Sequence, residues 1–121
     1  MSRSEFGRLA ELTVSKELEA KGYKILAQNY RKPWGEIDII AQKDKIISFV
    51  EVKASHQLLS GFEPELRANP DKIKRIIKTA RTYLSEKKYT YDQPWQIDVV
   101  AITLQGNGEI ATLNHFKNID V

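Results

Sequence analysis

The chain has 121 residues, of which 41% are hydrophobic and 29% charged, and its formal net charge is +3. These values are typical of one globular domain, residues 1–121, and exclude a disordered chain. The chain has no cysteine and only two histidines, which excludes disulfides, thiolate metal sites, cysteine nucleophiles and a histidine-rich metal site. Because there is neither an apolar leader nor an apolar run of the roughly 20 residues that a membrane span needs, we expect a cytoplasmic protein without a membrane partner.

A helix is expected at residues 5–21. Its apolar residues recur every four positions and therefore share one face, and they are Phe6, Ala10, Val14 and Leu18. Ser4 is the expected cap of the helix start, and Gly22 is the expected stop. A strand is expected next, at residues 23–30, before the break at Pro33.

The following segment predicts a β-hairpin. Two runs rich in β-branched residues, 35–41 and 46–53, are joined by a short polar link. If the hairpin turns about the Asp44–Lys45 bond, Asp38 lies directly opposite Glu51. This hairpin is the best-defined part of the predicted fold.

The rest of the chain predicts a loop, a second helix and two more strands. Residues 55–70 contain glycine and proline with little periodicity, which is typical of a loop. Residues 71–87 carry an apolar stripe at helical spacing, and strands are expected at 95–104 and 109–116. The expected fold class is therefore α/β, a mixed sheet with a central hairpin flanked by helices in the order α-β-β-β-α-β-β.

Asp38, Glu51 and Lys53 form the candidate chemical centre. Side chains alternate along a strand, so Glu51 and Lys53 share a face, and the Cβ atoms of Asp38 and Glu51 should lie about 4.5–5.5 Å apart. Like charges this close destabilise a fold, and a bound Mg²⁺ (or Mn²⁺) would relieve the repulsion and keep waters that substrate phosphates can replace. An ion pair between Lys53 and either acid explains the same spacing, so these residues alone leave both interpretations open.

The second expected helix carries a dense run of basic residues. Seven lysines and arginines between residues 72 and 88 are opposed by Glu86 alone. A phosphodiester substrate needs cations beside a metal centre, although a solvated helix face has the same composition. The residues expected to contact nucleic acid are Arg31, Lys72, Lys74, Arg75 and Lys78. Trp34 is expected to pack over a sheet edge, and Asp98 to support a polar network or cap a face of its strand, without a catalytic role.

Several segments together resemble one bacterial family. Residues 35–38 (Gly-Glu-Ile-Asp) followed by residues 49–53 (Phe-Val-Glu-Val-Lys) resemble the signature of the YraN-like family, within the restriction-endonuclease-like, or PD-(D/E)XK, nuclease superfamily. The resemblance extends nearly end to end through residues 7–11, 22–26, 29–31, 69–72 and 96–100. The chain departs from the pattern at Ala10, where the family has glycine, and at Ala54-Ser55, where a basic residue usually follows; the second change predicts weaker substrate binding.

The resemblance implies a restriction-endonuclease-like fold and metal-dependent, endonuclease-type hydrolysis of DNA, structure-selective in repair or recombination. Asp38 and Glu51 would hold Mg²⁺ (or Mn²⁺) with the backbone carbonyl of Val52. Lys53 would orient or activate water, and Glu11 would complete the site through a water or a second metal. Two alternatives stay open: a nucleic-acid-binding module on the same scaffold that cleaves nothing, and a structural or protein-interaction domain. DNA versus RNA is also open, as is a homodimer, which no residue indicates.

Overall fold

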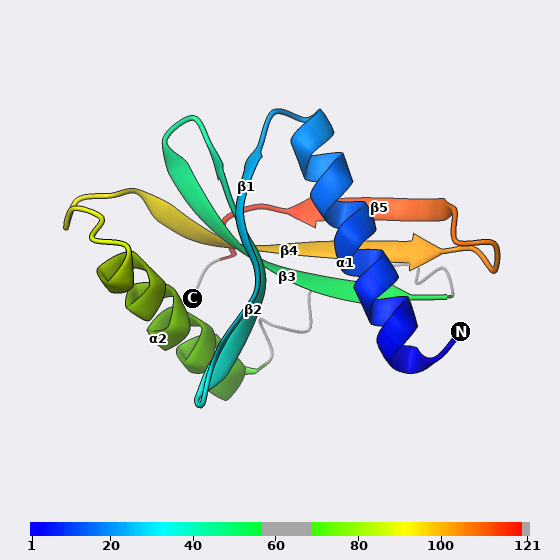
Figure 1. Cartoon of the computed structure of the whole chain (residues 1–121), viewed down its shortest axis with the longest axis horizontal. Helices are drawn as coiled ribbons and strands as arrows, with labels where there is room; N and C mark the ends of the chain where they lie inside the picture. Colours follow the sequence, from blue (N-terminus) through cyan, green and yellow to red (C-terminus); the bar gives the residue numbers. More distant parts are fainter. Residues whose placement is uncertain (57–68, 120–121) are drawn as a thin grey trace.

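The computed structural model describes residues 1–56 and 69–119, and its elements follow the expected order (Figure 1). They are helix α1 (Arg3–Ala20), strands β1 (Lys24–Lys32), β2 (Gly35–Lys43) and β3 (Ile46–Ser55), helix α2 (Pro70–Glu86), and strands β4 (Trp95–Leu104) and β5 (Ile110–Phe116). The prediction of an α/β fold with a five-stranded mixed sheet and two helices is confirmed. Most of the loop expected at residues 55–70 lies outside the described residues.

The start of α1 differs from the expectation, because Ser2 rather than Ser4 caps it. The Ser2 hydroxyl accepts the Glu5 N–H at 3.1 Å, and the Glu5 carboxylate accepts the Ser2 N–H at 3.2 Å. This reciprocal capping box satisfies two backbone donors that the helix itself leaves unpaired. The helix ends as expected before Gly22, whose φ of 95° is favourable only for glycine.

The strands form a single sheet in the order β1-β2-β3-β4-β5, with β3 and β4 parallel and the other neighbours antiparallel. The expected register of the β2–β3 hairpin holds over the paired residues, from Lys43 opposite Ile46 to Ile39 opposite Val50, but the expected pairing of Asp38 with Glu51 does not form. The pairing stops at Ile39 and Val50. On the far side of these residues β2 pairs only with β1 and β3 pairs only with β4, so the two strands diverge (Figure 1). The divergence leaves a notch in the sheet between β2 and β3.

Each face of the sheet is covered by one helix. The apolar face of α1 packs on β2, β3 and β4, and the buried residues of this core include Ala10, Val14, Leu18, Ile39, Val50 and Val100. On the other face α2 packs over Phe49, whose ring meets Tyr83 edge to face at a centroid distance of 6.0 Å. Burial of each such side chain contributes about 1.5–3 kcal/mol to folding. Within the described residues, neither helix is long and apolar enough to cross a bilayer.

The start of β2 lies directly against the backbone of α2. A Cβ atom on Gly35 would clash with the Thr79 hydroxyl and would lie 3.2 Å from the Arg75 carbonyl oxygen. Thr79 cannot easily move away, because its hydroxyl donates to that same carbonyl at 2.7 Å. Glycine at residue 35 therefore permits the close approach of the hairpin to α2.

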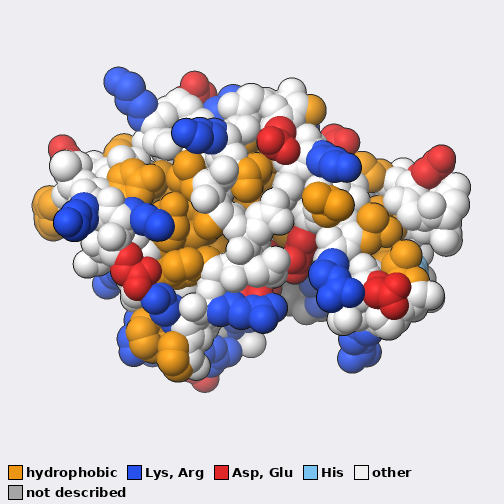
Figure 2. All heavy atoms as spheres, viewed as in Figure 1, with side chains coloured by type: hydrophobic (Ala, Val, Ile, Leu, Met, Phe, Trp, Pro, Cys, Tyr) orange, Lys and Arg blue, Asp and Glu red, His pale blue; other side chains and the backbone are white. Residues whose placement is uncertain are grey.

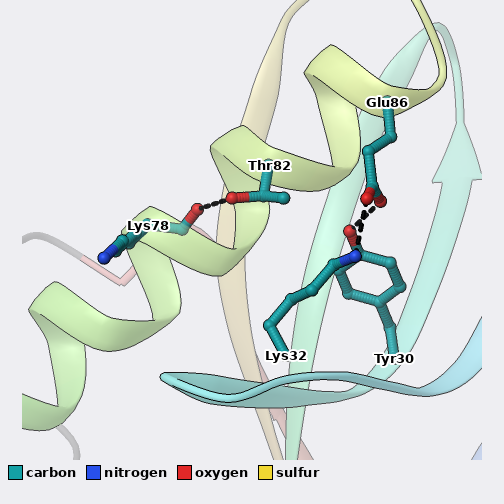
Figure 3. A network of polar contacts seen from close by, with 5 residues as sticks. All are labelled: Tyr30, Lys32, Lys78, Thr82 and Glu86. Carbon is teal, nitrogen blue, oxygen red and sulfur yellow. Dashed lines mark hydrogen bonds and ion pairs between the residues drawn. The ribbon is translucent and has the colours of Figure 1, made fainter.

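The last turn of α2 is tied to β1 through Glu86. Lys32 Nζ lies 2.6 Å from one Glu86 oxygen, and the Tyr30 hydroxyl donates to the other (Figure 3). The hydrogen bond from Lys32, followed by that from Tyr30, holds the pKa of Glu86 below its ordinary value. The contact is exposed and so adds little stability, but with Gly35 it fixes α2 relative to the β1–β2 hairpin at two points.

Candidate functional site

The notch between β2 and β3 brings the two expected metal-binding acids to one recess. The recess has a volume of about 190 Å³ and is lined by Gly35, Glu36, Asp38, Glu51, Lys72, Arg75 and Ile76. Figure 2 shows acidic side chains recessed between β2 and α1, with basic side chains beside them. The notch exists because the two strands separate just beyond Ile39 and Val50.

Asp38 lies where the backbone pairing of β2 and β3 stops. Its Oδ2 accepts the N–H of Val52 at 2.7 Å, so a side chain bridges the two strands where the backbone does not. Burial, followed by the negative charge of Glu51, raises the pKa of Asp38 from 3.8 to about 7. Glu11 and Glu36 add to this rise in pKa, and the hydrogen bond from Val52 opposes it. Ionised Asp38 is therefore disfavoured by its surroundings.

Glu51, on the other side of the notch, is paired with a cation from α2. Lys72 Nζ lies 2.9 Å from Glu51 Oε1, with the Lys72 side chain 43% exposed and that of Glu51 21% exposed. Lys72 is in the first turn of α2, where Asn69 caps the helix by accepting the Lys72 N–H at 3.1 Å. Arg75 lines the same recess one turn later. The notch thus holds carboxylates and cations side by side.

Glu11 approaches the carboxylate cluster from α1. Burial and then the charge of Glu36 raise the pKa of Glu11, while a hydrogen bond from Asn29 and the charge of Arg31 lower it. Asn29 has a φ of 51°, a left-handed conformation that asparagine tolerates better than most residues. Arg31 Nε lies 3.1 Å from Glu36 Oε1 and so is engaged by a neighbouring strand. Glu11 and Arg31 therefore influence the notch without lining it.

Lys53 lies outside the notch. It follows Glu51 by two residues on the same face of β3, but its side chain lines a neighbouring recess formed with β4 and β5. That recess is completed by Ser55, Ala101, Ile102, Thr103, Thr112 and Asn114. Asp38, Glu51 and Lys53, the expected chemical centre on the sheet, are thus adjacent along it, but only Asp38 and Glu51 share a pocket.

The basic residues of α2 separate into two groups. Lys72 and Arg75 line the notch, whereas Lys74 and Lys78 line a broader recess of about 570 Å³ along α2. Lys78 Nζ lies 4.5 Å from the centre of the Trp34 ring, and the Trp34 indole N–H is the one buried side-chain donor in residues 1–56 and 69–119 without a hydrogen-bond partner. The basic residues expected to act as one surface therefore face two recesses.

Comparison with known proteins identifies the family. A family model described as uncharacterised protein family UPF0102 matches residues 10–102, a range that contains every residue lining the notch.

The chain belongs to the UPF0102 family.

This finding confirms the resemblance to the YraN-like family. The UPF0102 protein of Wolinella succinogenes is 44% identical over 110 residues, which cover 91% of this chain and 93% of that protein. The UPF0102 protein of Syntrophus aciditrophicus is 44% identical over 103 residues, 84% of this chain and 79% of its own. The UPF0102 protein of Dictyoglomus thermophilum is 36% identical over 118 residues, 98% of each chain. These names give the family and no activity.

The donor set of this UPF0102 chain fits a hard divalent cation. Within the described parts of the chain, no group of three or more acidic or histidine side chains is arranged to hold a metal ion by itself. Mg²⁺ does not require such a group, because it commonly binds through one or two carboxylates and keeps several waters. Asp38 and Glu51 offer carboxylate oxygens at one recess, and their mutual repulsion is a cost that a divalent cation would remove. The residues therefore fit Mg²⁺ or Mn²⁺.

A second buried acid of this UPF0102 chain belongs to a different environment. Asp98 is fully buried on β4, where it accepts hydrogen bonds from Gln96 Nε2 and the Asn118 N–H, both at 2.9 Å. His115 Nε2 lies 2.8 Å from the other oxygen of Asp98. The expectation that Asp98 supports a polar network is confirmed. His115 was not predicted as part of this network, although an acid inside an apolar strand signals that a polar partner must lie nearby.

Proposed function

We propose that this UPF0102 protein is a metal-dependent phosphodiester hydrolase of the endonuclease type that acts on DNA. The observation that carries the proposal is the meeting of Asp38 and Glu51 in one notch, with Lys72 and Arg75 beside them. Acids alone can bind a cation, but acids beside cations can bind a cation and a phosphate together. The resemblance of residues 35–53 to the PD-(D/E)XK signature supports this function, and a restriction-endonuclease-like core is part of the proposal.

Asp38 and Glu51 would hold Mg²⁺ (or Mn²⁺) together with the backbone carbonyl of Val52. Glu11 would complete the site through a water or a second ion. When bound, the ion supplies a water of lowered pKa and positive charge for the phosphate oxygens. Because the pKa of Asp38 is about 7, this side chain is partly protonated at neutral pH and would release its proton on binding the ion.

Lys53 would orient the attacking water once substrate is bound. It lies on the same face of β3 as Glu51, about 7 Å further along the strand. A change of side-chain rotamer would carry its ammonium group from the neighbouring recess toward the notch. Lys72 and Arg75 would hold the substrate phosphate, while Lys74 and Lys78 would contact the DNA backbone further along α2.

A second candidate function is a nucleic-acid-binding module that cleaves nothing. Two observations favour it: Lys53 lies outside the notch, and the ion pair between Lys72 and Glu51 already compensates one of the two acids. This alternative predicts DNA binding with no dependence on the carboxylates.

The two functions are separated by incubating the protein with linear, nicked and branched DNA in Mg²⁺, Mn²⁺ or EDTA. We expect cleavage that requires the ion and falls at least about 100-fold in Asp38→Asn and in Glu51→Gln, since even outer-shell changes at metal sites cost up to about that much. Glu11→Gln should lower the rate less, and the matched variant Glu19→Gln, an exposed acid two turns later on α1, should leave it unchanged. Binding without cleavage of every substrate would support the non-cleaving module instead.

A further inference from the structure

The ion pair between Lys72 and Glu51 lies where the proposed divalent cation would bind. Lys72 Nζ is 2.9 Å from Glu51 Oε1, which is hydrogen-bond distance for an ammonium group and a carboxylate. A carboxylate oxygen that would coordinate an ion is therefore already an acceptor for a cation of the chain itself. Two cations cannot approach one oxygen this closely without strong mutual repulsion.

The charges around the notch explain why an internal cation is needed. Glu11, Glu36 and Glu51 all raise the pKa of Asp38, so four acidic side chains interact at one end of the hairpin. Arg31 is engaged with Glu36 on the exposed side. The Lys72 ammonium group reaches Glu51, and it therefore stabilises the ion-free fold at the point where β2 and β3 separate.

The Lys72 side chain can leave Glu51 without moving α2. The helix is held by the close contact of Gly35 with its backbone and by Glu86 at its last turn. Its buried stripe, which includes Ile76 and Ala80, adds apolar packing. The Lys72 side chain itself is 43% exposed, so a change of rotamer places its ammonium group in solvent or beside a ligand.

We propose that Lys72 is an internal counter-ion that a divalent cation displaces from Glu51, and that the displaced ammonium group then binds a phosphate of the substrate. The inference rests on the proposed function and adds an order of events, the ion first and the phosphate second. Since one side chain serves both states, ion binding and phosphate binding strengthen each other. Arg75, at the same recess, provides the second contact to the phosphate.

Calorimetric titration with MnCl₂ alone tests the displacement. Lys72→Met should bind Mn²⁺ about 3- to 10-fold more tightly than wild type, because Glu51 no longer has to release a cation. Lys74→Met is the matched control, since it removes the same charge two residues away on an exposed position of α2 that does not line the notch, and it should change the affinity less than about twofold. Lys72→Arg keeps the charge and should restore wild-type affinity. Equal affinities for Lys72→Met and Lys74→Met, or weaker binding by Lys72→Met, would overturn the inference.

The second half of the proposal is tested by the binding of a labelled DNA duplex in a Lys53→Met background, where cleavage is expected to be at least about 100-fold slower. Addition of Mn²⁺ should tighten DNA binding, and Lys72→Met should lose most of that gain. An equal gain with and without Lys72 would overturn the phosphate role. Circular dichroism and thermal unfolding establish that each variant is folded.

The outcomes separate this inference from the proposed function. If neither wild type nor Lys72→Met binds Mn²⁺, both fail together. If wild type cleaves DNA and Lys72→Met leaves the Mn²⁺ affinity unchanged, the function stands and the displacement is refuted. If wild type gives no heat while Lys72→Met binds Mn²⁺, the displacement is supported.

Discussion

Replacing Asp38 with asparagine should stabilise the ion-free protein and remove its response to Mg²⁺ or Mn²⁺. Burial and the charge of Glu51 raise the pKa of Asp38 from 3.8 to about 7 in the folded chain. Unfolding returns this carboxyl group to its ordinary pKa, so the unfolded chain loses the proton at a lower pH than the folded one. The free energy of unfolding therefore falls as the pH rises from about 4 to about 7, and the loss is complete above that range. Asparagine avoids the loss, and its Oδ1 can still accept the Val52 N–H.

The difference between the two pKa values sets the size of the effect. It corresponds to about 4 kcal/mol of unfolding free energy at about pH 8 and about 2 kcal/mol at about pH 5. The amide oxygen of asparagine is a weaker hydrogen-bond acceptor than a carboxylate oxygen, and this difference reduces the gain in unfolding free energy by about 1 kcal/mol. We expect Asp38→Asn to gain about 1–3 kcal/mol at the higher pH and about 1 kcal/mol or less at the lower pH.

The assay is thermal or urea unfolding followed by circular dichroism, first in EDTA at both pH values and then with MnCl₂. Asp98→Asn is the matched control, because Asp98 is also buried but its carboxylate is stabilised by hydrogen bonds from Gln96 Nε2 and the Asn118 N–H. It should lose about 2–3 kcal/mol at both pH values. Wild type should gain stability from Mn²⁺ by mass action, and Asp38→Asn should not. A variant less stable than wild type in EDTA at the higher pH would refute the electrostatic reasoning, and an undiminished response to Mn²⁺ would show that Asp38 is not a ligand.

Three further predictions concern the surroundings of the notch. Gly35→Ala should lower the unfolding free energy by about 1–3 kcal/mol, measured by urea unfolding against Gly7→Ala, where a new Cβ meets no atom within 4 Å. Lys53→Met should keep its calorimetric affinity for Mn²⁺ within about twofold and lose at least about 100-fold in DNA cleavage; cleavage at the wild-type rate would remove Lys53 from the mechanism. Glu86→Gln should lower the melting temperature at neutral pH and leave it unchanged at a pH well below 4.5. The reason is that Lys32 holds the pKa of Glu86 below 4.5, so the contribution of the ionised group is lost only at lower pH. An equal loss of melting temperature at both pH values would contradict this.

Local sequence patterns predicted most of the fold. The strand expected at residues 95–104 matches β4, because its run rich in β-branched apolar residues lies between Pro94 and the turn residues 105–108. The start of α1 was predicted less well. Ser2 and Ser4 are both good capping residues, and the choice of Ser2 depends on Glu5 reaching back to the Ser2 N–H. β1 extends two residues beyond the expected end, to Lys32, because pairing with β2 continues up to the turn.

The acids of the candidate site could be predicted better than the positions of its lysines. Asp38 and Glu51 could be placed near each other because the turn sets the register, and its residues Asp44 and Lys45 adopt the positive φ values of 52° and 68° that a tight hairpin requires. The contact between Lys72 and Glu51 could not be predicted in this way. It depends on how the crossover between the parallel strands β3 and β4 returns α2 to the sheet. Lys53 shares a face with Glu51 as alternation predicts, but alternation does not show that β3 leaves β2 and follows β4 beyond the notch.

Residue 35 is glycine and has no side chain. Under the proposed function, this affects which ions and phosphates the notch would admit. Gly35 lines the notch while its backbone rests on Arg75 and Thr79 of α2, so the space of one methyl group governs how far the acids stand from the cations. Size selection would then depend on the packing of two backbones rather than on the charged groups. Variant libraries at positions 35 and 79 are accordingly the place to seek altered ion preference with every carboxylate intact.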